Sequence, residues 1–294
     1  MADTPILAGE PFSPQKNQAI VNQFLRDGYV HVPNVLTVGE IAALRHKTDE
    51  LLNDPSLNKR DSTNSADEAF IETDAAFKGE SEKPETSSEE VPFILRNTIE
   101  LDQIFRDMLV REPIFSLAEA ILSFNYYKGM KFVGQNVIRN KPGLSIDTWH
   151  LDGDLHYPLP ESIKRHDPRV HLRVWWLTVQ MPLTDIESVE YGPTQYIPGS
   201  HYAGRHPHDQ KNPEFDGKGP VSAFCKAGDI YIQDSQTWHR GAPNTSDRTR
   251  YLFQSQYAAI WPRRSGRSLP IAGNALCDAS DQLLDLVGRL GPST

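Results

Sequence analysis

The chain has 294 residues, a formal net charge of -9 and only two cysteines. Because acidic residues outnumber basic ones and no Lys/Arg run occurs, nucleic acid and anionic membrane surfaces are poor partners. No basic stretch followed by an apolar run opens the chain, and no apolar stretch could cross a bilayer, so a cytoplasmic protein is expected. Cys225 and Cys277 are too few for a disulfide framework, which fits a reducing cytosol.

The N-terminal part of the chain is predicted to contain two helices around a short strand. Ser13-Pro14 begins the first helix, which ends at Gly28. Residues 29–32 predict a strand, and the capping box at 37–40 opens the second helix. From 53 to about 92 polar and acidic residues dominate, which predicts either a solvated surface insertion or a mobile lid over substrate.

The remainder of the chain predicts helices followed by a β-barrel. Apolar residues at helical spacing predict helices near 99–109 and 114–122, which brace a sheet from outside. Strands are expected at residues 130–139, 170–183, 230–233 and 250–260, and a short amphipathic helix at 283–287. The strand at 170–183 is apolar at nearly every position, so it should be central. Its polar exceptions, Thr178 and Gln180, share one face, which either packs structurally or looks into the barrel.

This order of elements favours a mostly β protein with flanking helices. Helices followed by about eight short strands fit a double-stranded β-helix, the jelly roll, with N-terminal helices bracing it. Because the informative motifs span the middle and the end of the chain, we expect one domain over 1–294 that includes the polar insertion.

Two distant segments carry side chains suited to a metal site. In a strand, His150 and Asp152 point to the same face and supply two thirds of a 2-His-1-carboxylate facial triad. Asp154 lies two residues further on and could compete as the carboxylate. His239 would complete the triad from a distant strand. An Arg beyond it, at 248 or 250, would offer a planar fork for a carboxylate, and the pattern alone does not choose between the two.

These motifs resemble the phytanoyl-CoA dioxygenase-like (PhyH) family of Fe(II)/2-oxoglutarate oxygenases. The resemblance is carried by segments 26–30, 149–152, 191–201 and 239–250. It implies that His150, Asp152 and His239 bind Fe(II). It further implies that an Arg eleven residues past the distal His binds the 2-oxoglutarate carboxylate, which selects Arg250. The same interval from His201 ends at Asn212, so His201 fails this test.

The resemblance also suggests further co-substrate contacts. A Thr that follows the Gly192-Pro193 pair can hydrogen-bond 2-oxoglutarate in this family, which makes Thr194 a candidate. Gln135 is a weaker candidate for a co-substrate or substrate contact. His206 and His208 form a pair suited to a metal, but they lie in a flexible stretch that contains Pro and are expected to be exposed.

The implied activity is that of a non-haem Fe(II)- and 2-oxoglutarate-dependent dioxygenase. Such an oxidoreductase uses O2 to hydroxylate a C–H bond of a small molecule and releases succinate and CO2, although desaturation or rearrangement would use the same residues. Related halogenases have Gly or Ala where this chain has Asp152, so halogenation is not expected. An acidic chain gives little support for a CoA-sized polyanion, which favours a secondary metabolite bound by a monomer or homodimer. The alternatives are a non-catalytic metal- or ligand-binding jelly roll, or a zinc hydrolase, and both leave Arg250 unexplained.

Overall fold

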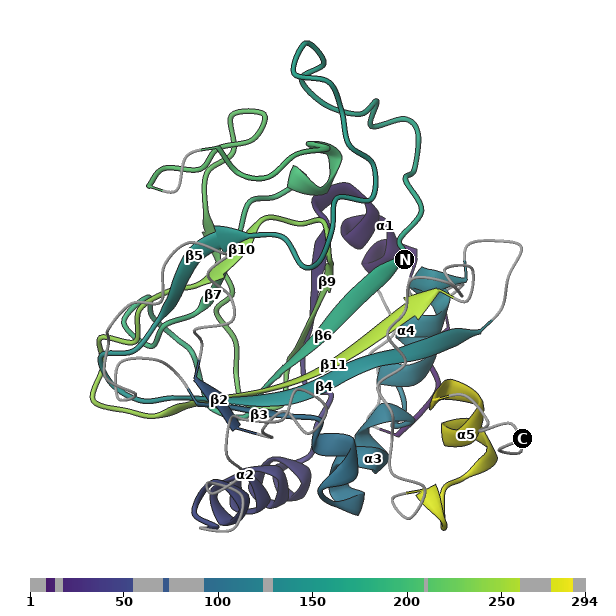
Figure 1. Cartoon of the computed structure of the whole chain (residues 1–294), viewed down its shortest axis with the longest axis vertical. Coiled ribbons are helices and arrows are strands. Elements are labelled where there is room, and N and C mark those ends of the chain that lie inside the picture. Colours follow the sequence, from purple (N-terminus) through teal and green to yellow (C-terminus); the bar gives the residue numbers. More distant parts are fainter. Residues whose placement is uncertain are drawn as a thin grey trace, which may run out of the picture.

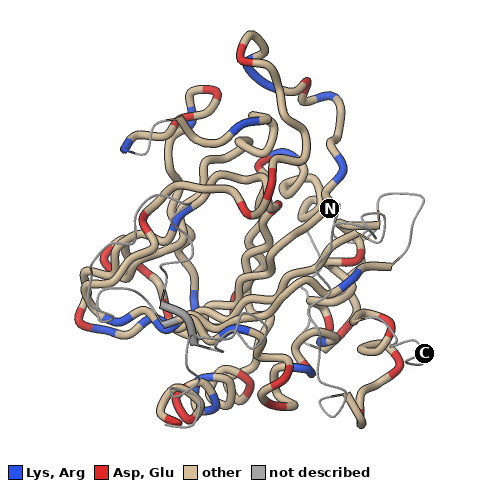
Figure 2. Tube along the Cα trace, in the orientation of Figure 1, with Lys and Arg blue, Asp and Glu red and all other residues tan. Residues whose placement is uncertain are grey.

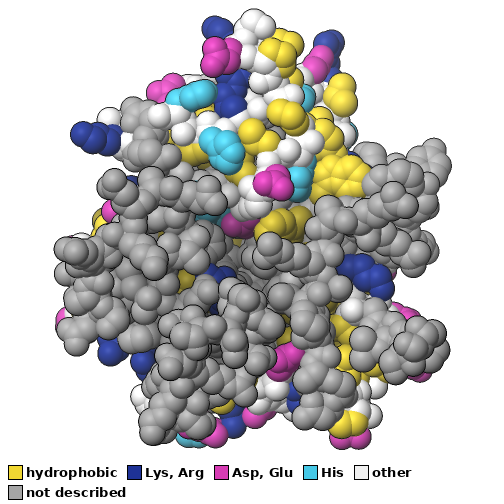
Figure 3. All heavy atoms as spheres, viewed as in Figure 1, with side chains coloured by type: hydrophobic (Ala, Val, Ile, Leu, Met, Phe, Trp, Pro, Cys, Tyr) yellow, Lys and Arg dark blue, Asp and Glu magenta, His cyan; other side chains and the backbone are white. Residues whose placement is uncertain are grey.

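The fold is seen in a computed structural model that describes residues 9–13, 18–54, 71–73, 93–123, 129–208, 211–259 and 276–287. Within these residues, the helices are all too short or too polar to cross a membrane. Lys and Arg are interspersed with Asp and Glu along the trace (Figure 2), and the described residues on the face in Figure 3 form no continuous basic patch. This distribution agrees with the lack of a Lys/Arg run in the sequence.

Two antiparallel sheets face each other and form the walls of a barrel (Figure 1). The larger sheet has the order β1 (Tyr29–Val32), β9 (Ile230–Asp234), β6 (Trp176–Pro182), β11 (Arg250–Ala259), β4 (Met130–Asn140), β3 (Phe93–Arg96) and β2 (Ile71–Thr73). The smaller sheet has the order β5 (Ile146–His150), β10 (His239–Gly241), β7 (Thr194–Tyr196) and β8 (Val221–Ser222). This arrangement confirms the predicted jelly-roll core.

The helices lie outside the barrel (Figure 1). They are α1 (Gln18–Asp27), α2 (Val38–Leu52), α3 (Gln103–Leu109), α4 (Ile114–Leu122) and α5 (Asp281–Val287), with 3-10 turns at Thr98–Glu100 and Ser200–Tyr202. The predicted capping box opens α2: the Thr37 side chain accepts from the backbone N–H of Glu40, whose carboxylate accepts from Thr37 N–H. Gly28 ends α1 at a φ of +81°.

Strand alternation divides β11 between the core and the barrel interior. Phe253 and Tyr257 face the helices: the Phe253 ring lies 5.6 Å from that of Phe105, and the Tyr257 hydroxyl donates to the carbonyl oxygen of Leu109. Arg250 lies three residues before Phe253, an odd interval that turns its side chain to the opposite face of the strand, into the barrel. The helices thus brace the larger sheet from outside, as the sequence predicts.

The central strand is shorter than the sequence indicates. β6 lies between β9 and β11, which confirms its central position, but it begins only at Trp176. Val170 is 58% exposed. The Tyr157 hydroxyl donates a hydrogen bond to the carbonyl oxygen of Arg173 at 3.0 Å, so this segment is bonded by a loop side chain and not by a neighbouring strand. Most of the polar insertion, and with it the choice between a lid and a surface loop, lies outside the described residues.

Candidate active site

Three ligand-type side chains converge at one end of the barrel. His150, the last residue of β5, pairs in register with His239, the first residue of β10, so both rings project from neighbouring strands to the same side. Asp152 follows two residues after His150. One ligand atom from each lies within 4.8 Å of the others, and Asp152 Oδ1 is 3.6 Å from His239 Nε2 and 4.0 Å from His150 Nε2. Such a donor set fits a divalent transition metal.

Both histidines are held in one tautomer by the same kind of hydrogen bond to the backbone. His150 Nδ1 lies 2.8 Å from the carbonyl oxygen of Thr148, and His239 Nδ1 lies 2.9 Å from that of Thr237. Because a carbonyl oxygen can only accept, each Nδ1 carries the proton and each Nε2 presents its lone pair toward Asp152. The backbone two residues before each ligand therefore orients it for metal binding.

The carboxylate of Asp152 is fixed by two side chains from the larger sheet. Thr178 Oγ1 on β6 and Gln233 Nε2 on β9 each lie 3.2 Å from Asp152 Oδ2 and donate to it. These bonds occupy Oδ2 and leave Oδ1 facing the histidines. Gln233 Nε2 also lies 3.1 Å from His239 Nε2, so one amide lies between two of the three ligand-type side chains.

A hydrogen-bonded chain extends from this amide into the barrel. Thr194 Oγ1 donates to Gln180 Oε1 at 2.9 Å, and Gln180 Nε2 donates to Gln233 Oε1 at 2.8 Å. This series of hydrogen bonds shows that the polar face of β6, which carries Thr178 and Gln180, lies inside the barrel. It places Thr194, a predicted co-substrate contact, inside the barrel. Gln233 was not singled out from the sequence, although a Gln that ends the apolar stretch Ile230-Tyr231-Ile232 is the signal that could have found it.

Arg250 is a buried cation without a counter-ion in the described part of the chain. It is 4% exposed, Nη1 donates to the carbonyl oxygen of Gly192, and Nε has no hydrogen-bond partner. Burial lowers its pKa from the usual arginine value to about 10, so it is charged at neutral pH. Nη2 would lie 3.7 Å from a Cβ at Gly241, two residues beyond His239. Two residues of strand span about 7 Å, so a short diacid could join the triad to this guanidinium.

The structure also distinguishes residues that the sequence left as alternatives. Asp154 is exposed, and the group of ligand-type side chains contains Asp152 instead. Arg248 is exposed as well, with its guanidinium carbon 4.0 Å above the ring of Tyr191. Asp152 and Arg250 are therefore the members of each pair that face the barrel interior.

Gln135 does not lie at this site, which corrects its predicted placement. Its Oε1 accepts from Thr98 Oγ1 at 2.8 Å, and its Nε2 donates to the carbonyl oxygen of Phe105 at 2.8 Å. Both partners belong to the helical layer outside the sheet. Asn136, the next residue of β4, pairs with Gln254 and faces the barrel.

The remaining candidate histidines lie away from the triad. His201 is buried, its Nε2 lies 3.2 Å from the carbonyl oxygen of Leu25, and burial lowers its pKa to about 4. It is therefore a neutral packing residue. His206 and His208 are exposed, as predicted.

The fold and the site together define the class: a jelly-roll protein of the non-haem iron, 2-oxoglutarate-dependent oxygenases. Residues 24–252 match the sequence profile described as phytanoyl-CoA dioxygenase (PhyH), and the chain belongs to this family. The matched residues include His150, Asp152 and His239 and extend past Arg250.

Individual relatives agree with this assignment. Dioxygenase af480 of Aspergillus fumigatus is 31% identical over 163 residues, which are 54% of this chain and 46%, less than half, of that protein. The carbocyclase SnoK from nogalamycin biosynthesis has a TM-score of 0.58 at 19% identity, with 85% of this chain and 87% of SnoK covered. HygX from Streptomyces hygroscopicus, solved with nickel, 2-oxoglutarate and hygromycin B, has a TM-score of 0.57 at 14% identity, with 83% and 88% covered. At these identities the two structures share the fold with this chain.

Proposed function

We propose that the protein is an Fe(II)- and 2-oxoglutarate-dependent dioxygenase that hydroxylates a C–H bond of a small molecule, with release of succinate and CO2. The observation that carries the proposal is Arg250, a buried guanidinium that no described carboxylate neutralises. An uncompensated buried charge costs several kcal/mol, so its retention points to an anion supplied from solution. The distal carboxylate of 2-oxoglutarate is such an anion.

The side chains of the barrel divide the work of binding. His150, Asp152 and His239 would hold Fe(II) and leave coordination positions open. Bound there, Fe(II) would supply the activation of O2. Arg250 would fix the far end of the diacid through its planar fork, and the Thr194 hydroxyl would provide a second polar contact. Hydrogen bonds from two other strands hold the carboxylate, and hydrogen bonds to the carbonyl oxygens two residues earlier hold both rings before any ligand arrives, so little reorganisation is needed on binding.

The substrate we propose is a secondary metabolite. SnoK is named for nogalamycin biosynthesis and HygX was solved with hygromycin B, which supports a small natural product as the substrate class. Hydroxylation is proposed instead of halogenation because Asp152 occupies the ligand position that a halide would need. We further propose that the enzyme works in the cytoplasm as a monomer or homodimer, without nucleic-acid or membrane partners. A barrel that only binds metal would have no use for Arg250.

The test is visible absorbance of the metal-free protein under anaerobic conditions, on addition of Fe(II) and then 2-oxoglutarate. A weak charge-transfer band should appear only with both, weaken strongly in Arg250→Met, and persist in Arg248→Met, a matched control two residues earlier. If metal analysis shows one bound iron but no band forms, the oxygenase proposal is refuted and the metal-binding barrel is favoured.

A further inference from the structure

A pocket of about 610 Å³ lies beside α2, where the chain enters β11. Its lining includes Arg45 from α2, Arg248 from the approach to β11, Arg250 at the start of β11, and the segment from Thr184 to Asp185 that follows β6. Several separate parts of the chain therefore meet around it. The volume is in the range of small-molecule sites.

Two guanidinium groups in this pocket each lie over the ring of a tyrosine. The guanidinium carbon of Arg248 lies 4.0 Å from the ring centroid of Tyr191, and that of Arg45 lies 5.1 Å from that of Tyr251. Arg248 also donates from Nη2 to the carbonyl oxygen of Asp185 at 3.3 Å. Stacking engages the face of a guanidinium and leaves N–H donors at its edge for a further partner. Neither arginine forms a salt bridge with any carboxylate of the described residues.

The balance of charge in the lining is positive. Asp185 is the one carboxylate among the described lining residues, and it already has partners: Oδ1 accepts from the backbone N–H of Ala227 at 2.8 Å, and Oδ2 lies 3.5 Å from Lys226 Nζ. The hydroxyls of Thr184, Ser246 and Thr249 add polar groups to the same wall. In a chain with a net charge of -9, this local excess of unpaired cations is unusual.

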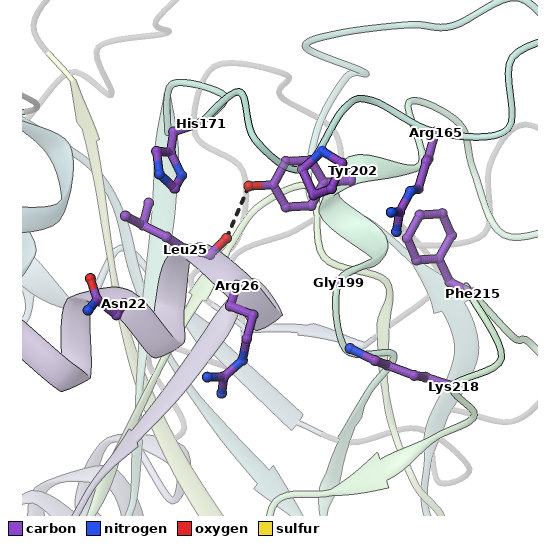
Figure 4. A pocket seen from close by; sticks show the side chains of 10 residues that line it. Asn22, Leu25, Arg26, Arg165, His171, Gly199, Tyr202, Phe215 and Lys218 are labelled. Carbon is purple, nitrogen blue, oxygen red and sulfur yellow. Dashed lines mark hydrogen bonds between the residues drawn. The ribbon is translucent and has the colours of Figure 1, made fainter.

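A second pocket, of about 310 Å³, offers a comparison in which both lining arginines already pair with carboxylates (Figure 4). Its lining holds Lys218 and two arginines; Arg26 pairs with Asp27 at 2.6 Å and Arg165 pairs with Asp216. Cations that are already neutralised gain little from another anion. Both arginines of this pocket are neutralised, whereas Arg45 and Arg248 form no salt bridge with a carboxylate of the described residues.

We propose that Arg45 and Arg248 bind a phosphate group of a small phosphorylated molecule in the 610 Å³ pocket. A phosphate offers at least three acceptor oxygens in different directions, which suits two planar forks together with hydroxyl donors. A single carboxylate has two oxygens in one plane and cannot satisfy both forks equally well. No residue of the triad is among the described lining residues, but Arg250, which the proposed function assigns to 2-oxoglutarate, is one of them. The inference therefore rests on Arg45 and Arg248 and not on Arg250.

The experiment is titration calorimetry of the full-length, metal-free protein with diphosphate as the probe, alongside inorganic phosphate and succinate. Diphosphate is expected to bind at one site. Arg45→Gln and Arg248→Gln should each weaken it by at least about tenfold, because a charge-assisted hydrogen bond is lost in each. The matched control is Arg169→Gln, an exposed arginine that pairs with Asp167 elsewhere and should leave binding unchanged.

Three outcomes would overturn the inference. They are absence of diphosphate binding, equal weakening by the control, and weakening of succinate binding by Arg45→Gln and Arg248→Gln as large as that of diphosphate binding. Both substituted arginines are exposed, so the variants should keep the wild-type unfolding midpoint, which thermal denaturation checks.

Discussion

Replacement of Arg250 by Met should make the ligand-free protein more stable while it abolishes co-substrate binding. Burial lowers the pKa of Arg250 from the usual arginine value to about 10, which corresponds to about 3 kcal/mol that disfavours the folded state. Methionine fills a similar volume without a charge, but it leaves the carbonyl oxygen of Gly192 without its donor, which costs about 1–3 kcal/mol. The difference predicts a rise of about 1 kcal/mol in the free energy of unfolding at pH 7.

The measurement is urea denaturation of metal-free protein without 2-oxoglutarate, followed by the same titration with Fe(II) and 2-oxoglutarate under anaerobic conditions. Fe(II) should stabilise both proteins, and 2-oxoglutarate should add further stability to the wild type but not to Arg250→Met. The charge on Arg250 is present in both folded and unfolded states below about pH 10, so the difference should not vary between pH 6 and 9. Arg248→Met, at an exposed position, should change stability by less than about 0.5 kcal/mol. A clear loss of stability in Arg250→Met would refute the reasoning, because it would mean that the charge is compensated within the fold.

Three further substitutions have defined expectations. Gln233→Leu removes a hydrogen bond to Asp152 and should weaken Fe(II) binding by about 10- to 100-fold, as a metal titration would measure; unchanged affinity would show that the amide is dispensable. His201 has a folded pKa of about 4, below its usual 6.5, so the unfolded state takes up the proton first and stability falls by about 3 kcal/mol as pH drops from 6.5 to 4. In His201→Gln the loss of stability over this pH range should be smaller by about 3 kcal/mol. Identical stability profiles of the variant and the wild type would contradict the prediction. Gly28→Ala places a Cβ at 2.3 Å from Thr237 Oγ1 at a positive φ, and should lower stability by about 1–3 kcal/mol in thermal unfolding; a neutral effect would mean that the turn relaxes.

The part of the site that the sequence predicts is the part encoded by short spacing. His150 and Asp152 share a face because strands alternate with a period of two, and this holds whatever the rest of the barrel does. The choice of Arg250 over Arg248 rests on a family interval, and the burial of Arg250 agrees with it. Spacing along one strand therefore predicts which side chains share a face, and the family interval predicts which arginine is buried.

What the sequence could not supply is the direction in which a strand faces. β4 carries polar residues on both faces, and the period of two does not say which one meets the barrel, so Gln135 was placed at the site although Asn136 faces it. The role of Gln233 depends on the register of β9 against β6, which brings it beside Thr178. Register depends on packing between distant segments and cannot be predicted from the sequence of either strand alone.

The position of β5 at the end of its sheet has a consequence for handling the protein. Among the described residues β5 pairs with β10 on one side only, yet it carries His150 and leads directly to Asp152. A metal held by these residues and His239 would tie an edge strand to its neighbour, as a covalent staple would. In the metal-free protein, the amide hydrogens of β5 should exchange faster than those of β10, which is paired on both sides. The same exposed edge would then be open to pairing with another molecule, so removal of metal should shorten the time the protein stays monodisperse in storage.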